Sequence, residues 1–98
     1  MQVSDNEIAI VLDIIKKHAP ECNVLVFGSR FKGTARNHSD LDLAFKCKSG
    51  ERLGIQRAAI LREDFQESEL PYRVDVVDYH AVTDEFRAII NRGFFRIY

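Results

Sequence analysis

Two short motifs in this sequence carry side chains that could do phosphate chemistry together with a metal ion. The first is Gly28-Ser29 and the second is Asp40-Leu41-Asp42, with ten residues between Ser29 and Asp40. Residues i and i+2 of a strand point to the same side. Asp40 and Asp42 would therefore lie side by side, about 6.6 Å apart at about 3.3 Å per residue. Hard carboxylate oxygens of this kind suit Mg²⁺.

A third carboxylate, Asp75, falls on the next predicted strand, at about residues 72–79. The core-facing apolar positions of that strand are even-numbered, so alternation points Asp75 to the side of Asp40 and Asp42 and turns Asp78 away. Three converging like charges repel one another, and divalent cations would neutralise them. Two such ions about 3.5–4 Å apart can activate an attacking hydroxyl and stabilise a leaving oxygen.

The phosphate side of this prediction begins where the apolar run 24–27 stops. Gly28 would let the backbone approach a ligand closely, and Ser29 would start a helical turn whose N–H groups favour an anion. A structural alternative remains open, because Gly28 can simply end a strand and Ser29 can simply cap a helix.

Basic and hydroxyl side chains follow these two residues. Arg30, Lys32 and Arg36 add local positive charge, and Ser39 offers a hydroxyl beside the predicted metal ligands. The basic residues could equally form an ordinary solvated face. His38 adjoins Ser39, but a single loop histidine is more often a surface residue. We interpret the other two histidines, at positions 18 and 80, as structural.

The elements that must position these motifs are predicted from periodicity and capping. Ser4 to Glu7 matches a capping box, and Thr83 can cap a last helix. We expect helices over about 4–18, 29–33, 51–68 and 83–93, and strands over about 23–27, 40–47 and 72–79. This order predicts an α+β fold, a small mixed sheet of three or more strands with helices on one face. The acidic face would be open.

Composition restricts the class of protein. The 98 residues suit a single domain over 1–98, with 46% hydrophobic and 30% charged residues. A net charge of −1 does not favour general nucleic-acid binding. No apolar run approaches the roughly 18 residues of a membrane span, and the start lacks the features of a signal peptide. We expect a cytoplasmic protein without membrane association. We interpret Cys22 and Cys47 as small buried hydrophobic residues or neutral residues at a sheet edge, rather than as a metal site or disulfide framework.

The sequence ends on an apolar segment, 94–98. One interpretation is that this tail packs onto the helices or extends an edge of the sheet. The alternative is that it forms part of a subunit interface.

The motifs as a set resemble a known family. Gly28-Ser29 with the ten-residue spacing to Asp40-Leu41-Asp42, and a third acid at Asp75, is similar to the minimal nucleotidyltransferases of the DNA polymerase beta-like superfamily. The segments around the motifs, Gly28–Gly33 and Ser39–Ala44, also resemble that family. The resemblance covers essentially the whole sequence. It implies a nucleotidyltransferase-like fold. It also implies that Ser29 contacts a triphosphate, with Arg30 as a weaker candidate. Asp40 and Asp42 would bind Mg²⁺, and Asp75 would complete the metal site and help activate an acceptor hydroxyl.

The reaction that this resemblance implies is transfer of a nucleoside monophosphate, commonly AMP from ATP, with two Mg²⁺ ions, or Mn²⁺ in their place. Many small members resemble antitoxins paired with helical HEPN-domain ribonucleases. The family's larger members hold the base and the acceptor with an additional helical domain. This sequence has no such domain, so we expect a partner protein or a second copy of the chain to supply the surface that holds them. We expect nucleic acid to take part only as the acceptor of the transferred group or as the target of the partner protein. The competing hypotheses are an antitoxin that acts by contact alone and a nucleotide sensor.

Overall fold

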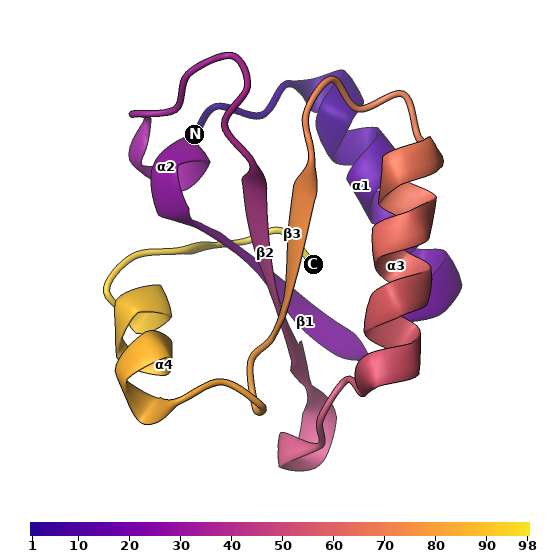
Figure 1. The fold of residues 1–98 in the computed structure, drawn as a ribbon, viewed down its shortest axis with the longest axis vertical. Coiled ribbons are helices and arrows are strands. Elements are labelled where there is room, and N and C mark those ends of the chain that lie inside the picture. Colours follow the sequence, from indigo (N-terminus) through magenta and orange to yellow (C-terminus); the bar gives the residue numbers. More distant parts are fainter.

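The computed structural model describes all 98 residues as four α-helices, four strands and a 3-10 helix (Figure 1). The helices are α1 (Asp5–His18), α2 (Gly28–Lys32), α3 (Ile55–Glu67) and α4 (Asp84–Asn91), and the 3-10 helix is η1 (Lys48–Gly50). The strands are β1 (Cys22–Phe27), β2 (Leu41–Cys47), β3 (Val74–Asp78) and β4 (Phe95–Arg96). None of the helices combines the length and apolar character needed to cross a membrane.

The strands form one mixed sheet in the order β3-β2-β1-β4. β1 pairs antiparallel with β2 and with β4, whereas β2 and β3 run parallel. The predicted α+β class with a mixed sheet is therefore confirmed. The register places Phe27, Asp42 and Asp75 in one row across three neighbouring strands, so that the end of β1 lies beside both acids.

Helices cover both faces of the sheet, which corrects the expectation that they gather on one. The larger core joins α1 and α3 to one face, with Val11, Ile15, Leu43, Phe45 and Leu61 fully buried. A second cluster lies on the other face, where Ile90 of α4 packs with Leu25, Phe27, Ala44, Val77 and Tyr79. In Figure 1, α4 stands apart from α1 and α3. The reason is that the face of the sheet that carries the acids also carries apolar side chains, which are removed from water when α4 packs on them.

The helix starts agree with the capping signals in two cases and differ in one. Ser4 and Glu7 form the predicted capping box, and the Thr83 hydroxyl accepts the Phe86 N–H at 3.2 Å. Helix α3 begins at Ile55 instead of residue 51, because Gly54 has φ +92°, outside the helical region.

Cys22 and Cys47 are joined by a disulfide bond, so the expectation that they form no disulfide is wrong. Both are buried, as one interpretation predicted. The two cysteines are register partners across β1 and β2. The cysteines are 25 positions apart in sequence, so their proximity could not be predicted without knowing that β1 and β2 pair antiparallel.

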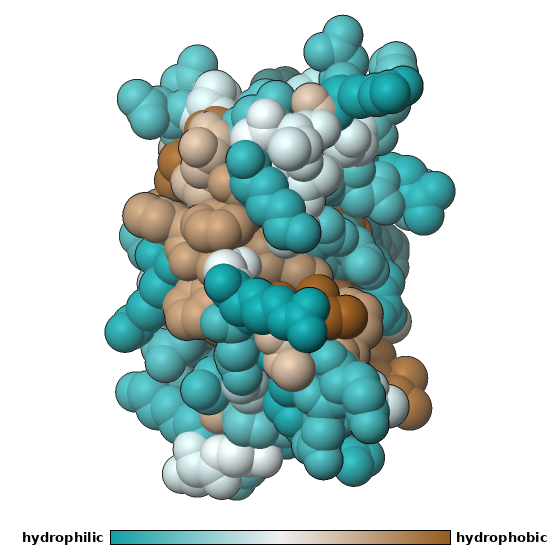
Figure 2. All heavy atoms as spheres, turned by 90° about the vertical axis from the view of Figure 1, so that its left-hand side faces the viewer, coloured by the Kyte–Doolittle hydropathy of each residue, from teal (hydrophilic) through white to brown (hydrophobic).

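The C-terminal tail extends the sheet, as one interpretation predicted. Phe95 pairs with Val26, and Arg96 pairs with Leu25. Apolar surface remains uncovered on the side of the molecule that carries α2, α4 and the tail (Figure 2). Ile89 and Phe95 are each 50% exposed, and Phe94 is 41% exposed. The role of this surface as a subunit interface stays a prediction.

Candidate functional site

The site is centred on a contact between Gly28 and Asp42. Gly28 follows the last residue of β1 and has φ +74°. A Cβ built at this position would lie 2.1 Å from the Asp42 Oδ2 atom. Any other residue would therefore displace the carboxylate as well as strain the backbone. The two motifs, separate in sequence, form one site.

Asp75 lies next to Asp42 because these residues are register partners in the parallel pair β2–β3. Burial, then the charge of Asp75, then that of Asp40 raise the pKa of Asp42 to about 6 from an ordinary value of 3.8. Asp40 itself is exposed and precedes β2. The three predicted acids thus influence one another, with Asp42 at the centre.

The donor chemistry of this face suits a divalent cation. Because Gly28 has no Cβ, the Asp42 carboxylate lies directly against the Gly28 backbone, at the end of β1 where a phosphate would bind. A cation there would relieve the repulsion between the neighbouring carboxylates. The structure does not gather three His, Cys, Asp or Glu side chains closely enough to hold a metal ion. Asp42 and Asp75 are the residues that the fold places side by side, and Asp40 would have to turn toward them. The three-carboxylate metal site remains a prediction.

Asp78, the rejected candidate for the third acid, points to the other side of the sheet. Its Oδ2 atom accepts the Gly54 N–H at 3.1 Å, at the start of α3. The alternation argument that separated Asp75 from Asp78 agrees with this placement.

Ser29 lies in the short helix α2, directly after Gly28. Its carbonyl accepts the N–H groups of Gly33 and Thr34, which closes this helix. Gly33 adopts the left-handed conformation expected of a helix C-cap. Ser29 is partly exposed. Its contact to a triphosphate stays a prediction.

Arg30 does not face the site, which corrects its assignment as a phosphate contact. It is 6% exposed, and its guanidinium donates to the backbone carbonyls of Gln2, Asn37 and Ser39 at 2.9–3.2 Å. It also lies over the Tyr72 ring, 3.6 Å from the centroid. Its donors are used to hold the loop that leads to Asp40.

Ser39 has a structural role in the same loop. Its hydroxyl accepts the Arg36 N–H at 2.9 Å, which shapes the turn before β2. The nucleotide contact predicted for Ser39 stays a prediction. Lys32 and Arg36 are exposed.

Two residues that the sequence did not single out for the site, Glu7 of α1 and Tyr72 before β3, support Arg30 and through it this loop. The Tyr72 hydroxyl donates to the Glu7 carboxylate at 2.8 Å. Burial, and then this hydrogen bond, raise the pKa of Tyr72. Burial acts to raise the pKa of Glu7, but the hydrogen bonds from Ser4 and Tyr72 lower it overall. The capping box identified Glu7, but no local signal connects it with a tyrosine 65 positions later.

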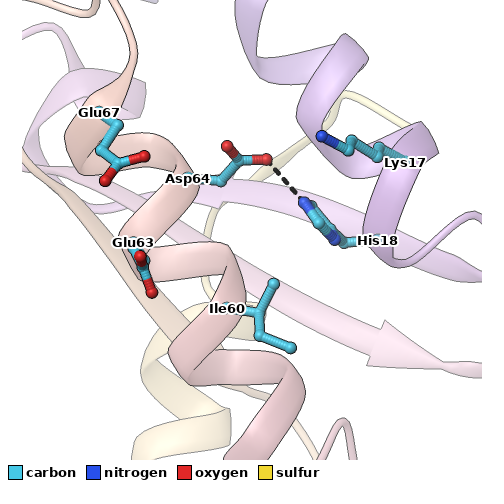
Figure 3. A pocket seen from close by; sticks show the side chains of 6 residues that line it. All are labelled: Lys17, His18, Ile60, Glu63, Asp64 and Glu67. Carbon is cyan, nitrogen blue, oxygen red and sulfur yellow. Dashed lines mark hydrogen bonds and ion pairs between the residues drawn. The ribbon is translucent and has the colours of Figure 1, made fainter.

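A pocket of about 190 Å³ opens between α1 and α3, away from the predicted acids (Figure 3). His18 and Asp64 face each other across it, with Nε2 and Oδ2 2.6 Å apart. The pair joins the two helices, which agrees with a structural role for His18.

The fold and the paired acids define a nucleotidyl-transfer class of protein, and comparison with known families agrees. The chain belongs to the family described as polymerase beta, nucleotidyltransferase, whose model matches residues 4–94.

Among individual proteins, the chain is 41% identical to the probable protein adenylyltransferase MntA of Haemophilus influenzae. The match extends over 92 residues, which are 94% of this chain and 79% of that protein.

Two solved structures share the fold. The crystal structure of a toxin–antitoxin with AMP-PNP superposes with a TM-score of 0.79 at 20% identity, over 93% of this chain and 72% of that one. A mutant of the toxin–antitoxin MntA-HpeT gives a TM-score of 0.77 at 17% identity, with the same coverage of both chains. This similarity confirms the predicted nucleotidyltransferase-like fold.

Proposed function

We propose that this protein is a Mg²⁺-dependent nucleotidyltransferase that transfers AMP from ATP to an acceptor on a partner toxin. The observation that carries the proposal is the Gly28–Asp42 contact, since it joins the phosphate motif and the acidic motif into one site. The relative described as a probable protein adenylyltransferase supports AMP as the group transferred and protein as the acceptor.

Each residue has a role in this proposal. Gly28 and Ser29 receive the triphosphate at the end of β1. An acceptor hydroxyl oxygen forms a bond to the α-phosphorus, the bond from that phosphorus to pyrophosphate breaks, and the hydroxyl proton passes to the Asp75 carboxylate. Asp40, Asp42 and Asp75 would hold Mg²⁺, which when bound neutralises the charge on the phosphates.

The partner in this proposal is a helical HEPN-type toxin. The solved toxin–antitoxin complexes with the same fold support a toxin partner, and the helical class follows from the resemblance of the motifs to HEPN-paired antitoxins. Such a partner would supply the acceptor hydroxyl and a surface that contacts the base of the nucleotide.

The test is transfer of label from α-labelled ATP, with Mg²⁺, to the helical protein encoded beside this one. We expect label on the partner with the parent and with Asp13→Asn, an exposed acid on α1. We expect none with Asp40→Asn or Asp42→Asn. Label that persists in either of these two variants would refute the catalytic assignment.

A second candidate function is an antitoxin that neutralises its partner by contact alone. The observation that favours it is the uncovered apolar surface of α4 and the tail (Figure 2).

Titration of the toxin's ribonuclease activity separates the two functions. Neutralisation without ATP, retained by Asp42→Asn and lost in a Phe94→Ser/Phe95→Ser variant, would establish the contact mechanism. Neutralisation that needs both ATP and Asp42 would exclude it.

A further inference from the structure

A groove runs along the outer side of β3, on the edge of the sheet next to α3. Two adjoining hollows of about 300 Å³ and 330 Å³ share Gln66 and Arg73. The first also includes Arg62 and Val74, and the second reaches His38. Figure 1 shows α3 beside β3 along this edge. His38 lies in the loop that leads to Asp40, so the second hollow reaches the loop before β2.

The groove is lined by positive charge without a balancing acid. None of its lining residues is Asp or Glu. Arg62 and Arg73 take part in none of the three ion pairs of the protein. Arg62 donates only to the Val76 carbonyl, at 3.0 Å. In a chain with net charge −1, two arginines free of carboxylates provide a local attraction for an anionic group.

The wall of the groove can also pair with a polypeptide backbone. β3 is an edge strand, and its Arg73 carbonyl is used by the Leu41 N–H of β2. By the alternation of a parallel ladder, the backbone groups of Val74 face outward. An extended segment can add to such an edge through main-chain hydrogen bonds. The apolar side chains of Phe65 and Leu70 line the same groove.

We propose that this groove docks an acidic, extended segment of the acceptor polypeptide and leads its hydroxyl toward Asp75. Arg62 and Arg73 would pair with carboxylates of the segment, and Val74 would pair with its backbone. The proposal deepens, and rests on, the proposed transfer function. The free edge at Val74 favours a polypeptide over an oligonucleotide, which would need several phosphate contacts or stacked bases.

Fluorescence anisotropy tests the groove without requiring catalysis. The probes are a fluorescein-labelled acidic peptide, a basic peptide of equal length, and a single-stranded oligonucleotide of the same charge as the acidic peptide. The variants are Arg62→Gln/Arg73→Gln and a matched control, Arg52→Gln/Arg92→Gln. The control removes the same charge from two exposed positions outside the groove.

We expect the acidic peptide alone to bind, and the groove variant to weaken it about tenfold, equal to about 1.4 kcal/mol. The control variant should bind as the parent does. Equal weakening in both variants, tighter binding of the oligonucleotide, or no binding of the acidic peptide would each overturn the proposal.

Label transfer separates this proposal from the proposed function. The groove variant should raise KM for the partner and leave KM for ATP unchanged. An unchanged KM for the partner would overturn the groove proposal alone. Absence of transfer by the parent would overturn the transfer function, and the groove proposal would then depend on the peptide-binding result.

Discussion

Replacement of Asp42 by Asn should stabilise the metal-free protein at neutral pH while abolishing transfer. The fold raises the pKa of Asp42 from 3.8 to about 6, so ionisation of this carboxyl is less favourable in the folded than in the unfolded protein. At 1.36 kcal/mol per pH unit, this shift corresponds to at most about 3 kcal/mol of unfolding free energy above pH 6. Because Asp42 is only half-buried, solvent screening reduces the cost of its ionisation to about 1–3 kcal/mol. Asn cannot ionise and escapes this cost.

The sign of the pH dependence follows from the raised pKa. Below about pH 4, Asp42 is mostly neutral in both states, and Asp and Asn should give similar stability. As pH rises from 4 to 6, the unfolded chain ionises first, so the parent loses stability relative to Asp42→Asn. Above pH 6 the difference should be constant.

Urea unfolding in EDTA at pH 4.0, 5.5 and 7.5 measures this difference, with Asp13→Asn as the matched exposed control. We expect Asp42→Asn to gain about 1–3 kcal/mol at pH 7.5 and little at pH 4.0. Mg²⁺ should then stabilise the parent at pH 7.5 more than the variant. A gain that does not change with pH, or a loss of stability at pH 7.5, would refute the account of Asp42 as a repelled, partly buried carboxylate.

Three further predictions concern the backbone, the loop and the disulfide. Gly28→Ala should abolish label transfer because its Cβ meets Asp42, whereas Gly33→Ala, with a similar φ of +80° but no atom within 4 Å, should lose only about 1 kcal/mol in urea and keep transfer. Arg30→Met should cost about 2–4 kcal/mol of unfolding free energy, since it removes the part-buried hydrogen bonds to the carbonyls of Gln2, Asn37 and Ser39; an unchanged urea midpoint would contradict its role in the loop. Cys22→Ser should cost about 3 kcal/mol for a closed loop of this length, measured by urea unfolding without reductant; an unchanged urea midpoint would contradict a stabilising role for the disulfide.

Much of the local structure could be predicted from the sequence. The caps at Ser4 and Thr83 and the alternation that separates Asp75 from Asp78 depend on neighbours a few positions away. Such signals do not depend on how the strands pair. They sufficed to predict the order of helices and strands and to place Asp75 on the same side of the sheet as Asp42.

Arg30 shows why the remainder was not predictable. A basic residue directly after Gly28-Ser29 has the same sequence pattern whether it contacts a phosphate or holds a loop. Its partners include Gln2 and Tyr72, which are far from it in sequence and come together only when α1 and β3 pack. The cover that α4 provides for the acidic face has the same origin, because it depends on where the chain returns after β3.

By itself, the sequence determined which residues can do chemistry and to which side of their strands they point, because alternation and capping are local. Only the tertiary structure decided which of them meet. The register of β1 with β2 puts Gly28 against Asp42 and Cys22 against Cys47, and the register of β2 with β3 adds Asp75. These distances depend on strand pairing between distant segments, and the site exists because that pairing brings a glycine without a Cβ against a carboxylate.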